Sequence, residues 1–290
     1  MRYIDPTFYA SRRSPAELEL MSAAGLVGLV EPTTWYGTSR RYAETYIDDF
    51  DRLIGPEARR ANHYGMGYAA AIGVTPQEAN NFAVAQAVVE AMPRFLKNAE
   101  NVVALGEIGL ERGTGAEEEI FRRQIRLAKQ YGLPVVAVLP THDRREIALR
   151  TLTLLSEEGF PAHAVVINGV TDETLPYVRE FGCWYGLTID RNTHLSPERA
   201  VHLLQHQGLE GAMVHSAAGR MLGDPLAVPR FARAMREAGF SLDAIEKITF
   251  HNPKWFFSQG RPLPLPVTYR KEERREAQQR PESRQRALSH

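Results

Sequence analysis

The sequence predicts an α/β fold, a (β/α)8 TIM-type barrel, over residues 1–260. Short apolar runs rich in β-branched residues alternate with amphipathic stretches, about eight such units follow one another, and capping or turn residues separate them. Alternation of strand and helix is typical of a parallel sheet, and about eight repeats close that sheet into a barrel. The chain has 290 residues, 43% hydrophobic and 24% charged, which is ample for one large α/β domain.

The expected strands are the apolar runs that end at a polar or turn residue, and they cover residues 3–4, 26–30, 67–73, 102–107, 134–140, 164–168, 184–189 and 212–215. Helix starts support this register. Ser14-Pro15-Ala16-Glu17 reads as a capping box with proline at the first helical position, and Thr75-Pro76 and Ser196-Pro197 predict further starts. The same arrangement of strands and helices is supported by glycines where helices should end: Gly25, Gly132, Gly182 and Gly239.

The second and third expected strands are separated by a long insertion, residues 32–66. It contains Thr33-Thr34-Trp35-Tyr36-Gly37 and a helical stretch over 41–53. A long connection on the mouth side of a barrel is typical of a substrate-shaping cap, and plain helical decoration is the alternative. The sequence leaves both interpretations open.

The amino-acid composition changes after Gln259, where prolines and then charged residues predominate. Pro262-Leu263-Pro264-Leu265-Pro266 cannot lie inside a helix and predicts an extended connector, and from Arg270 onward arginine and lysine outnumber glutamate. We therefore expect residues 261–290 to form a Pro-rich connector and a charged, flexible tail. The tail is either a docking arm for a protein or nucleic acid or a solvated segment, and the solvated segment is favoured.

Bulk properties limit the function classes. Cys183 is the only cysteine, which excludes an intramolecular disulfide and a Cys-rich zinc motif. Lys+Arg and Asp+Glu both total 35, so nothing in the charge balance calls for nucleic acid as a partner. The sequence shows no secretory signal and no apolar run long enough to span a membrane, and we expect a cytoplasmic protein without a membrane partner.

Glu107 is the first candidate for chemistry. It ends an apolar run and stands within Gly106-Glu107-Ile108-Gly109, at the carboxyl end of a barrel strand, where such folds do their chemistry. Tyr9 and His215 are its expected proton-sharing partners, because both fall at or just beyond strand ends. The alternative is that Glu107 is a structural remnant that only hydrogen-bonds Tyr9 or a strand-end amide. The expected substrate-binding residues lie at the same edge: Glu31, Trp35, Tyr36, Asn168, Asp190 and Arg220.

Several short motifs occur at these strand ends in a characteristic order: Ile4-Asp5-Pro6, Glu31-Pro32, Gly106-Glu107-Ile108-Gly109, Ser216-Ala217-Ala218, Asp224-Pro225-Leu226 and His251-Asn252-Pro253. Over roughly residues 1–260 this order resembles the TatD-type metal-dependent hydrolases, in particular a branch encoded in secondary-metabolite operons. The resemblance implies an amidohydrolase-like barrel that binds two divalent metals and hydrolyses phosphoester or related bonds with a metal-activated water.

The metal ligands implied by the resemblance are largely missing. The first strand's histidine pair falls on Thr7 and Tyr9, and the other positions fall on Glu107, Val138, Gly169 and Gly219. Only Glu107 offers a good ligand, so we expect no metal and no other cofactor. A relocated site of Glu107, His142 and His215 is the alternative. The histidines at positions 163, 202, 206 and 251 are interpreted as structural.

Three functions stay open. The first is a metal-independent enzyme of specialised metabolism that acts on a small molecule, with Glu107 as general acid/base. The second is an inactive pseudoenzyme that binds a ligand, or a protein partner through the C-terminal tail. The third is a metal-dependent hydrolase of phosphoester or nuclease type that uses replacement ligands.

Overall fold

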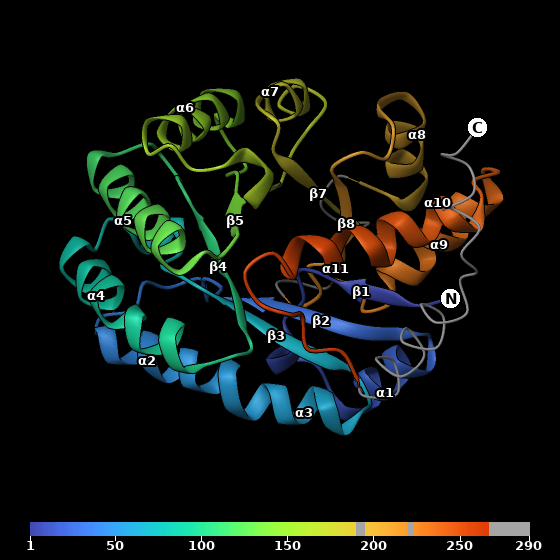
Figure 1. Ribbon diagram of the computed structural model, residues 1–290, viewed down its shortest axis with the longest axis horizontal. Helices are drawn as coiled ribbons and strands as arrows, with labels where there is room; N and C mark the ends of the chain where they lie inside the picture. Colours follow the sequence, from blue (N-terminus) through green and yellow to red (C-terminus); the bar gives the residue numbers. More distant parts are fainter. Residues whose placement is uncertain (190–194, 220–222, 267–290) are drawn as a thin grey trace, which may run out of the picture.

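The computed structural model describes residues 1–189, 195–219 and 223–266. They form a barrel of eight parallel strands, each hydrogen-bonded to the next in sequence order, which confirms the predicted (β/α)8 fold (Figure 1). Every expected strand is present within one or two residues. The strands are β1 (Tyr3–Asp5), β2 (Leu26–Pro32), β3 (Gly67–Ile72), β4 (Val102–Gly109), β5 (Val135–Val138), β6 (Val165–Asn168), β7 (Trp184–Thr188) and β8 (Ala212–His215).

Helices connect the strands and cover the outside of the barrel (Figure 1). They are α1 (Pro15–Ala23), α2 (Ala43–Arg52), α3 (Ala58–His63), α4 (Phe82–Asn98), α5 (Gly115–Tyr131), α6 (Arg144–Glu157), α7 (Leu175–Phe181), α8 (Pro197–Gln207), α9 (Ala227–Glu237), α10 (Leu242–Glu246) and α11 (Asn252–Phe257). The short turns η1 (Ala10–Arg12), η3 (Pro76–Glu78) and η4 (Ala162–Ala164) are 3-10 helices, and η2 (Leu53–Glu57) and η5 (Lys247–His251) are single π-helical turns. No helix in the described ranges is both long and apolar enough to cross a bilayer.

The predicted helix starts are confirmed at two of three positions. Ser14 forms a complete capping box with Glu17, and the Ser196 side chain accepts from the N–H of Arg199. The prediction at Thr75 is wrong, because Thr75 precedes only the 3-10 turn η3 and α4 begins after Asn81. The side chain of Thr75 accepts no capping hydrogen bond from η3, and its hydroxyl donates to Glu78.

The barrel is closed between its first and last strands by hydrogen bonds just beyond their ends. The N–H of Ala217 donates to the carbonyl of Thr7 at 2.9 Å, and the N–H of Tyr9 donates to the carbonyl of Ala218 at 3.0 Å. The carboxylate of Asp5 adds a third link, because it accepts from both the N–H and the hydroxyl of Ser216. These bonds hold the segments after β1 and β8 together at the mouth.

The barrel interior is filled by small and branched side chains from alternating strand positions, among them Ile4, Val30, Val103 and Val136. Its floor is covered by α11 and by the segment that follows it, since Leu263 and Leu265 are 5% and 7% exposed and pack into the same cluster. Gly67 makes room for this segment, because a Cβ there would meet the carbonyl oxygen of Pro264 at 1.9 Å. The described part of the expected connector, residues 261–266, thus packs as barrel floor, and residues 267–290 lie outside the described ranges.

The insertion after β2 runs from the mouth to the outer layer. Its helical part is α2, η2 and α3 on the outside of the barrel (Figure 1), which matches the helix expected over 41–53. The preceding loop, residues 33–42, stays at the mouth, where the N–H of Thr33 donates to the carbonyls of Ala71 and Gly106.

Candidate active site

Glu107 lies in an irregularity of strand β4. Gly106 pairs with Val136 and Ile108 pairs with the next residue, Ala137, so Glu107 is the extra residue of a β-bulge. Bulges near barrel mouths re-aim a side chain, and they leave the bulged residue outside the regular ladder. The loop after β2 supports the bulge instead, because the N–H of Glu107 donates to the carbonyl of Thr33 at 3.4 Å. The side chain of Glu107 is 4% exposed.

Tyr9 reaches Glu107 across the mouth. Its hydroxyl Oη lies 3.3 Å from Oε2 of Glu107 and donates to it, and the Tyr9 side chain is fully buried. Tyr9 stands between β1 and η1, whereas Glu107 comes from β4, so the contact joins elements 98 residues apart. A phenol that donates to a carboxylate stabilises its ionised form. The structure brings these two expected residues into contact, and their catalytic roles stay predictions.

His215 belongs to a second group of polar side chains. It ends β8, is 2% exposed, and its Nε2 lies 3.3 Å from the hydroxyl of Thr188 at the end of β7. Asn168 is its neighbour across Gly186: a Cβ at Gly186 would lie 2.0 Å from the Asn168 Oδ1 and 3.1 Å from the His215 Cδ2. The amide of Asn168 donates to the hydroxyl of Thr7 at 3.2 Å. Side chains thus link the ends of β7 and β8 to each other and the end of β6 to the segment just after β1.

Two further carboxylates are buried at the mouth. Burial raises the pKa of Asp5 to about 7 although the hydroxyl and N–H of Ser216 and the N–H of Thr7 donate to it. Burial likewise raises the pKa of Glu31 to about 7, and Arg52 opposes that rise. Perturbed carboxyl groups gather at functional sites and also in structural networks.

Glu31 is committed to protein contacts. Its Oε2 accepts from the N–H of Ala10 at 2.9 Å and from the hydroxyl of Tyr68 at 3.0 Å, and Arg52 lies 3.7 Å from its Oε1. The carboxylate is 1% exposed. The structure therefore places Glu31 as an anchor for the start of η1, and its expected role in substrate binding stays a prediction.

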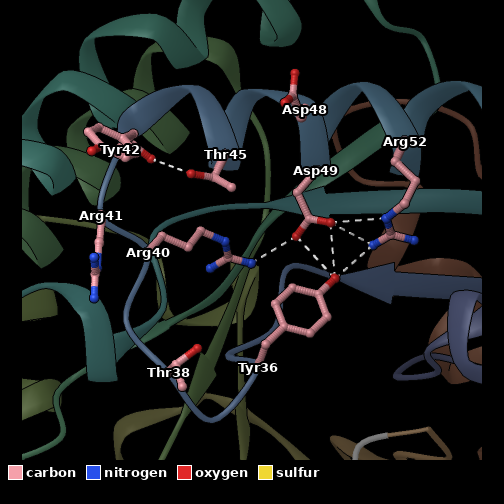
Figure 2. A pocket seen from close by; sticks show the side chains of 9 residues that line it. All are labelled: Tyr36, Thr38, Arg40, Arg41, Tyr42, Thr45, Asp48, Asp49 and Arg52. Carbon is pink, nitrogen blue, oxygen red and sulfur yellow. Dashed lines mark hydrogen bonds and ion pairs between the residues drawn. The ribbon is translucent and has the colours of Figure 1, made fainter.

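Trp35 and Tyr36 lie at the rim, where they are 36% and 44% exposed. Figure 2 shows Tyr36 beside a pocket of about 510 Å³ between the 36–42 loop and α2. Its hydroxyl donates to Asp49 at 3.0 Å and accepts from Arg52 at 3.1 Å, and its ring stacks against the guanidinium of Arg12. Asp190 and Arg220, the remaining expected substrate-binding residues, lie outside the described ranges.

Arg40 holds this rim together, and no sequence pattern predicts that role. It is 7% exposed and forms ion pairs with Asp49, at 2.9 Å, and with Glu78, while its guanidinium also donates to the carbonyl of Thr34 at 3.0 Å. The guanidinium packs over the ring of Tyr46, whose hydroxyl donates to Glu78 at 2.7 Å. An arginine in a polar loop carries no signal of burial, because its partners come from three separate segments. We call Arg40, Asp49, Glu78 and Tyr46 the rim cluster.

Comparison with known proteins identifies the family. A family model described as TatD related DNase matches residues 56–258, which is more than half of the chain. The chain belongs to the TatD family. A metal-dependent hydrolase of Methanocaldococcus jannaschii, described as uncharacterised, is 29% identical over 256 residues, which cover 88% of this chain and 99% of the relative.

Solved structures share the fold of this TatD-family chain. The TatD-like protein of Archaeoglobus fulgidus superimposes with a TM-score of 0.72 at 24% identity and covers 88% of this chain and 99% of its own. The phosphotriesterase homology protein of Escherichia coli, solved with phosphate in its active site, gives a TM-score of 0.66 at 18% identity and covers 89% and 99%. At these identities the likeness shows the barrel fold.

The TatD family resemblance implies two divalent metals, but the donor set at the strand ends does not fit them. Of the positions that correspond to ligands, Val138, Gly169 and Gly219 have no donor atom in their side chains. Thr7 and Tyr9 are weak ligands because a hydroxyl or phenol is seldom ionised at neutral pH. Throughout the described part of the chain, no three or more histidine, cysteine or acidic side chains are grouped to hold a metal ion.

The alternative site of Glu107, His142 and His215 is not assembled among the described residues either. The side chain of His142 is 45% exposed, and its Nδ1 lies 3.9 Å from Oε1 of Glu111 at the rim. Residues 190–194, which include Asp190 and His194, and residues 220–222 lie outside the described ranges and are not part of this test.

Proposed function

We propose that this TatD-family barrel is an enzyme that acts on a small molecule at the strand ends without the family's two metal ions, with Glu107 as the general acid/base. The observation that carries the proposal is the 3.3 Å contact between the Tyr9 hydroxyl and the Glu107 carboxylate. Tyr9 stands where the resemblance implies a metal-binding histidine, and Glu107 is the acid that the resemblance implies to bridge the metals. A proton-sharing pair thus takes the place of a ligand pair.

Tyr9 and Glu107 can share a proton, because a phenol can both donate and accept a hydrogen bond. When Glu107 takes a proton from a bound water or from the substrate, the same phenol can turn its oxygen toward the carboxylic acid and accept. The bulge in β4 and the bond from the Glu107 N–H to Thr33 hold the carboxylate at a fixed place in the mouth. Rigid placement of this kind is what general acid/base catalysis requires.

His215 has a supporting role in this proposal. Its Nε2 shares a hydrogen bond with Thr188, and the ring lies beside Asn168 at the same edge of the barrel. These side chains can orient a polar substrate, while Trp35 and Tyr36 provide aromatic surface at the rim. The substrate that the family branch implies is a small specialised metabolite.

The test is a turnover measurement in metal-free buffer. The chain is freed of metal with a chelator and screened against chromogenic phosphoesters, esters and amides; we expect turnover that added Zn²⁺ or Mn²⁺ leaves unchanged. Glu107→Gln keeps the shape of the side chain and removes its basicity, so kcat should fall by roughly 10²- to 10⁴-fold. Glu111→Gln is the matched control, because Glu111 lies just past the end of β4 and bonds Gln77 at the rim. Turnover that appears only with added metal would overturn the proposal.

A pseudoenzyme is the second candidate, and the burial of the site favours it. Glu107, Tyr9 and His215 are at most 4% exposed, and each bonds another side chain of the protein. This candidate predicts ligand binding without turnover across the whole screen. The metal-dependent hydrolase is the third candidate, and it is supported by the relative of that description, which spans 88% of this chain. It predicts turnover that the chelator abolishes.

A further inference from the structure

Helix α8 carries two histidines one turn apart on its exposed face. His202 and His206 are four residues apart, a spacing that puts two side chains on the same side of a helix. Both are exposed. Their Nε2 atoms lie 3.1 Å apart, with ring centroids separated by 4.4 Å. Two imidazole nitrogens therefore lie next to each other on the exposed face of the helix.

The separation of the nitrogens matches chelation of a single metal ion. At a metal–nitrogen distance of about 2.0–2.1 Å, nitrogens 3.1 Å apart subtend about 95–102° at the metal. That angle lies between the right angle of neighbouring ligands in square-planar and octahedral complexes and the tetrahedral angle that zinc prefers. Imidazole suits Cu²⁺ and Ni²⁺, which adopt the former geometries.

We propose that His202 and His206 form a surface site for a divalent transition metal ion of the Cu²⁺ or Ni²⁺ type. The two imidazoles would supply two adjacent ligands, and water would fill the remaining positions. No third histidine, cysteine or acidic side chain of the described residues joins them in a metal-binding group. The site is thus open, and its free positions can exchange water for a ligand from solution.

This site is separate from the strand ends. His206 lies in the last turn of α8, and the helix runs away from the mouth after the loop that follows β7. The sequence indicates a structural role for both histidines, and only the 3.1 Å distance distinguishes a chelating pair from two unrelated surface residues. Metal in the purified protein that His202→Gln removes would therefore belong to α8 and not to the strand ends.

The test is a calorimetric titration of Ni²⁺ into the full chain, free of any histidine tag. We expect one Ni²⁺ per chain at this site, with an affinity that falls at least tenfold in His202→Gln and in His206→Gln. Glutamine is a good helix former and both positions are exposed, so the variants should fold. Ni²⁺ should raise the Tm of the wild-type chain and leave that of His202→Gln unchanged, because a ligand stabilises only the state that binds it.

His63→Gln is the matched control, since His63 is exposed near the end of α3, where its ring packs on Tyr64, and it has no histidine partner. It should bind Ni²⁺ as the wild type does. Wild-type affinity in both His202→Gln and His206→Gln would overturn the proposal. The Glu107→Gln variant should bind Ni²⁺ at α8 as the wild type does. Failure of the α8 site and failure of the proposed catalytic function can therefore be told apart.

Discussion

Tyr9 fills the space that a side chain at position 219 would need. A Cβ built on Gly219 would lie 2.7 Å from the Cβ of Tyr9 and 2.6 Å from its carbonyl oxygen. Gly219 also has a φ of +110°, which L side chains rarely adopt. The family resemblance implies a metal-binding aspartate at position 219 and a histidine at position 9. A side chain at position 219 therefore cannot be introduced without strain, because it would meet the Cβ and the backbone of residue 9.

Restoring the acid by Gly219→Asp should destabilise the fold. The backbone conformation and the clash with Tyr9 together predict a loss of about 2–4 kcal/mol in the free energy of unfolding. Urea denaturation followed by circular dichroism measures it. Tyr9→Ala keeps the Cβ and the carbonyl oxygen that a side chain at position 219 would meet, so it should not relieve the clash, and the double variant should lose about the sum of the two single losses.

Gly115→Asp is the control for that substitution. Gly115 begins α5, nothing lies within 4 Å of a Cβ placed there, and an acid in the first turn of a helix is favourable. Its stability should equal or exceed that of the wild type. A Gly219→Asp variant as stable as this control would contradict the steric argument.

The buried Asp5 makes stability depend on pH. Burial raises its folded pKa to about 7, whereas an unfolded aspartate titrates near pH 3.9. The folded state therefore holds the proton over that interval. The contribution of Asp5 is fully present below about pH 4 and is lost as pH rises to about 7, by up to roughly 1.4 kcal/mol per pH unit.

Asp5→Asn mimics the neutral carboxyl and should flatten this part of the profile. Urea unfolding at pH values from 4.5 to 8 measures the slope. Glu31, whose pKa burial also raises to about 7, should supply the slope that remains. Asp48→Asn, at an exposed position of α2, should leave the profile unchanged. The idea fails if Asp5→Asn and the wild type lose stability equally with rising pH.

Loss of the Arg40 guanidinium should strongly destabilise the rim cluster. Arg40→Met leaves the buried Glu78 without its ion-pair partner and leaves Asp49 paired with Arg52 alone, and loss of one partner of a buried pair typically costs about 3–5 kcal/mol. The carbonyl of Thr34 would also lose its guanidinium donor. Thermal unfolding should show a clearly lower Tm.

Arg41→Met is the neighbouring control. Arg41 lines the same pocket but is exposed (Figure 2), so its loss should change the free energy of unfolding by no more than about 0.5 kcal/mol. Equal effects of the two substitutions would mean that the ion pairs of Arg40 do not stabilise the rim.

The eight strands could be predicted because each is a short apolar run bounded by turn residues, and burial on both faces requires that pattern. Caps were predictable at Ser14 and Ser196, where an α-helix begins directly after the serine. Thr75 misled the prediction because a 3-10 turn follows it, and its hydroxyl bonds Glu78 and Tyr46 of another segment.

The packing of the barrel floor could not be predicted from the sequence either. The proline pattern of residues 262–266 correctly excludes a helix, but it cannot reveal that Leu263 and Leu265 are buried. Their burial depends on an opening below β2 and β3 that Gly28 and Gly67 leave for them. Complementarity between distant segments is a property of packing and leaves no local period in the sequence.

The residue types alone established which chemical groups stand where the family resemblance implies metal ligands: one glutamate, two hydroxyls, a valine and two glycines. They could do so because barrel topology sends every strand end to one edge. Which of the groups at that edge touch each other became known only from the folded chain. Tyr9 meets Glu107, Asn168 meets Thr7 and Asp5 meets Ser216 because the bulge in β4 and the closure between β1 and β8 set distances that no spacing along the chain encodes.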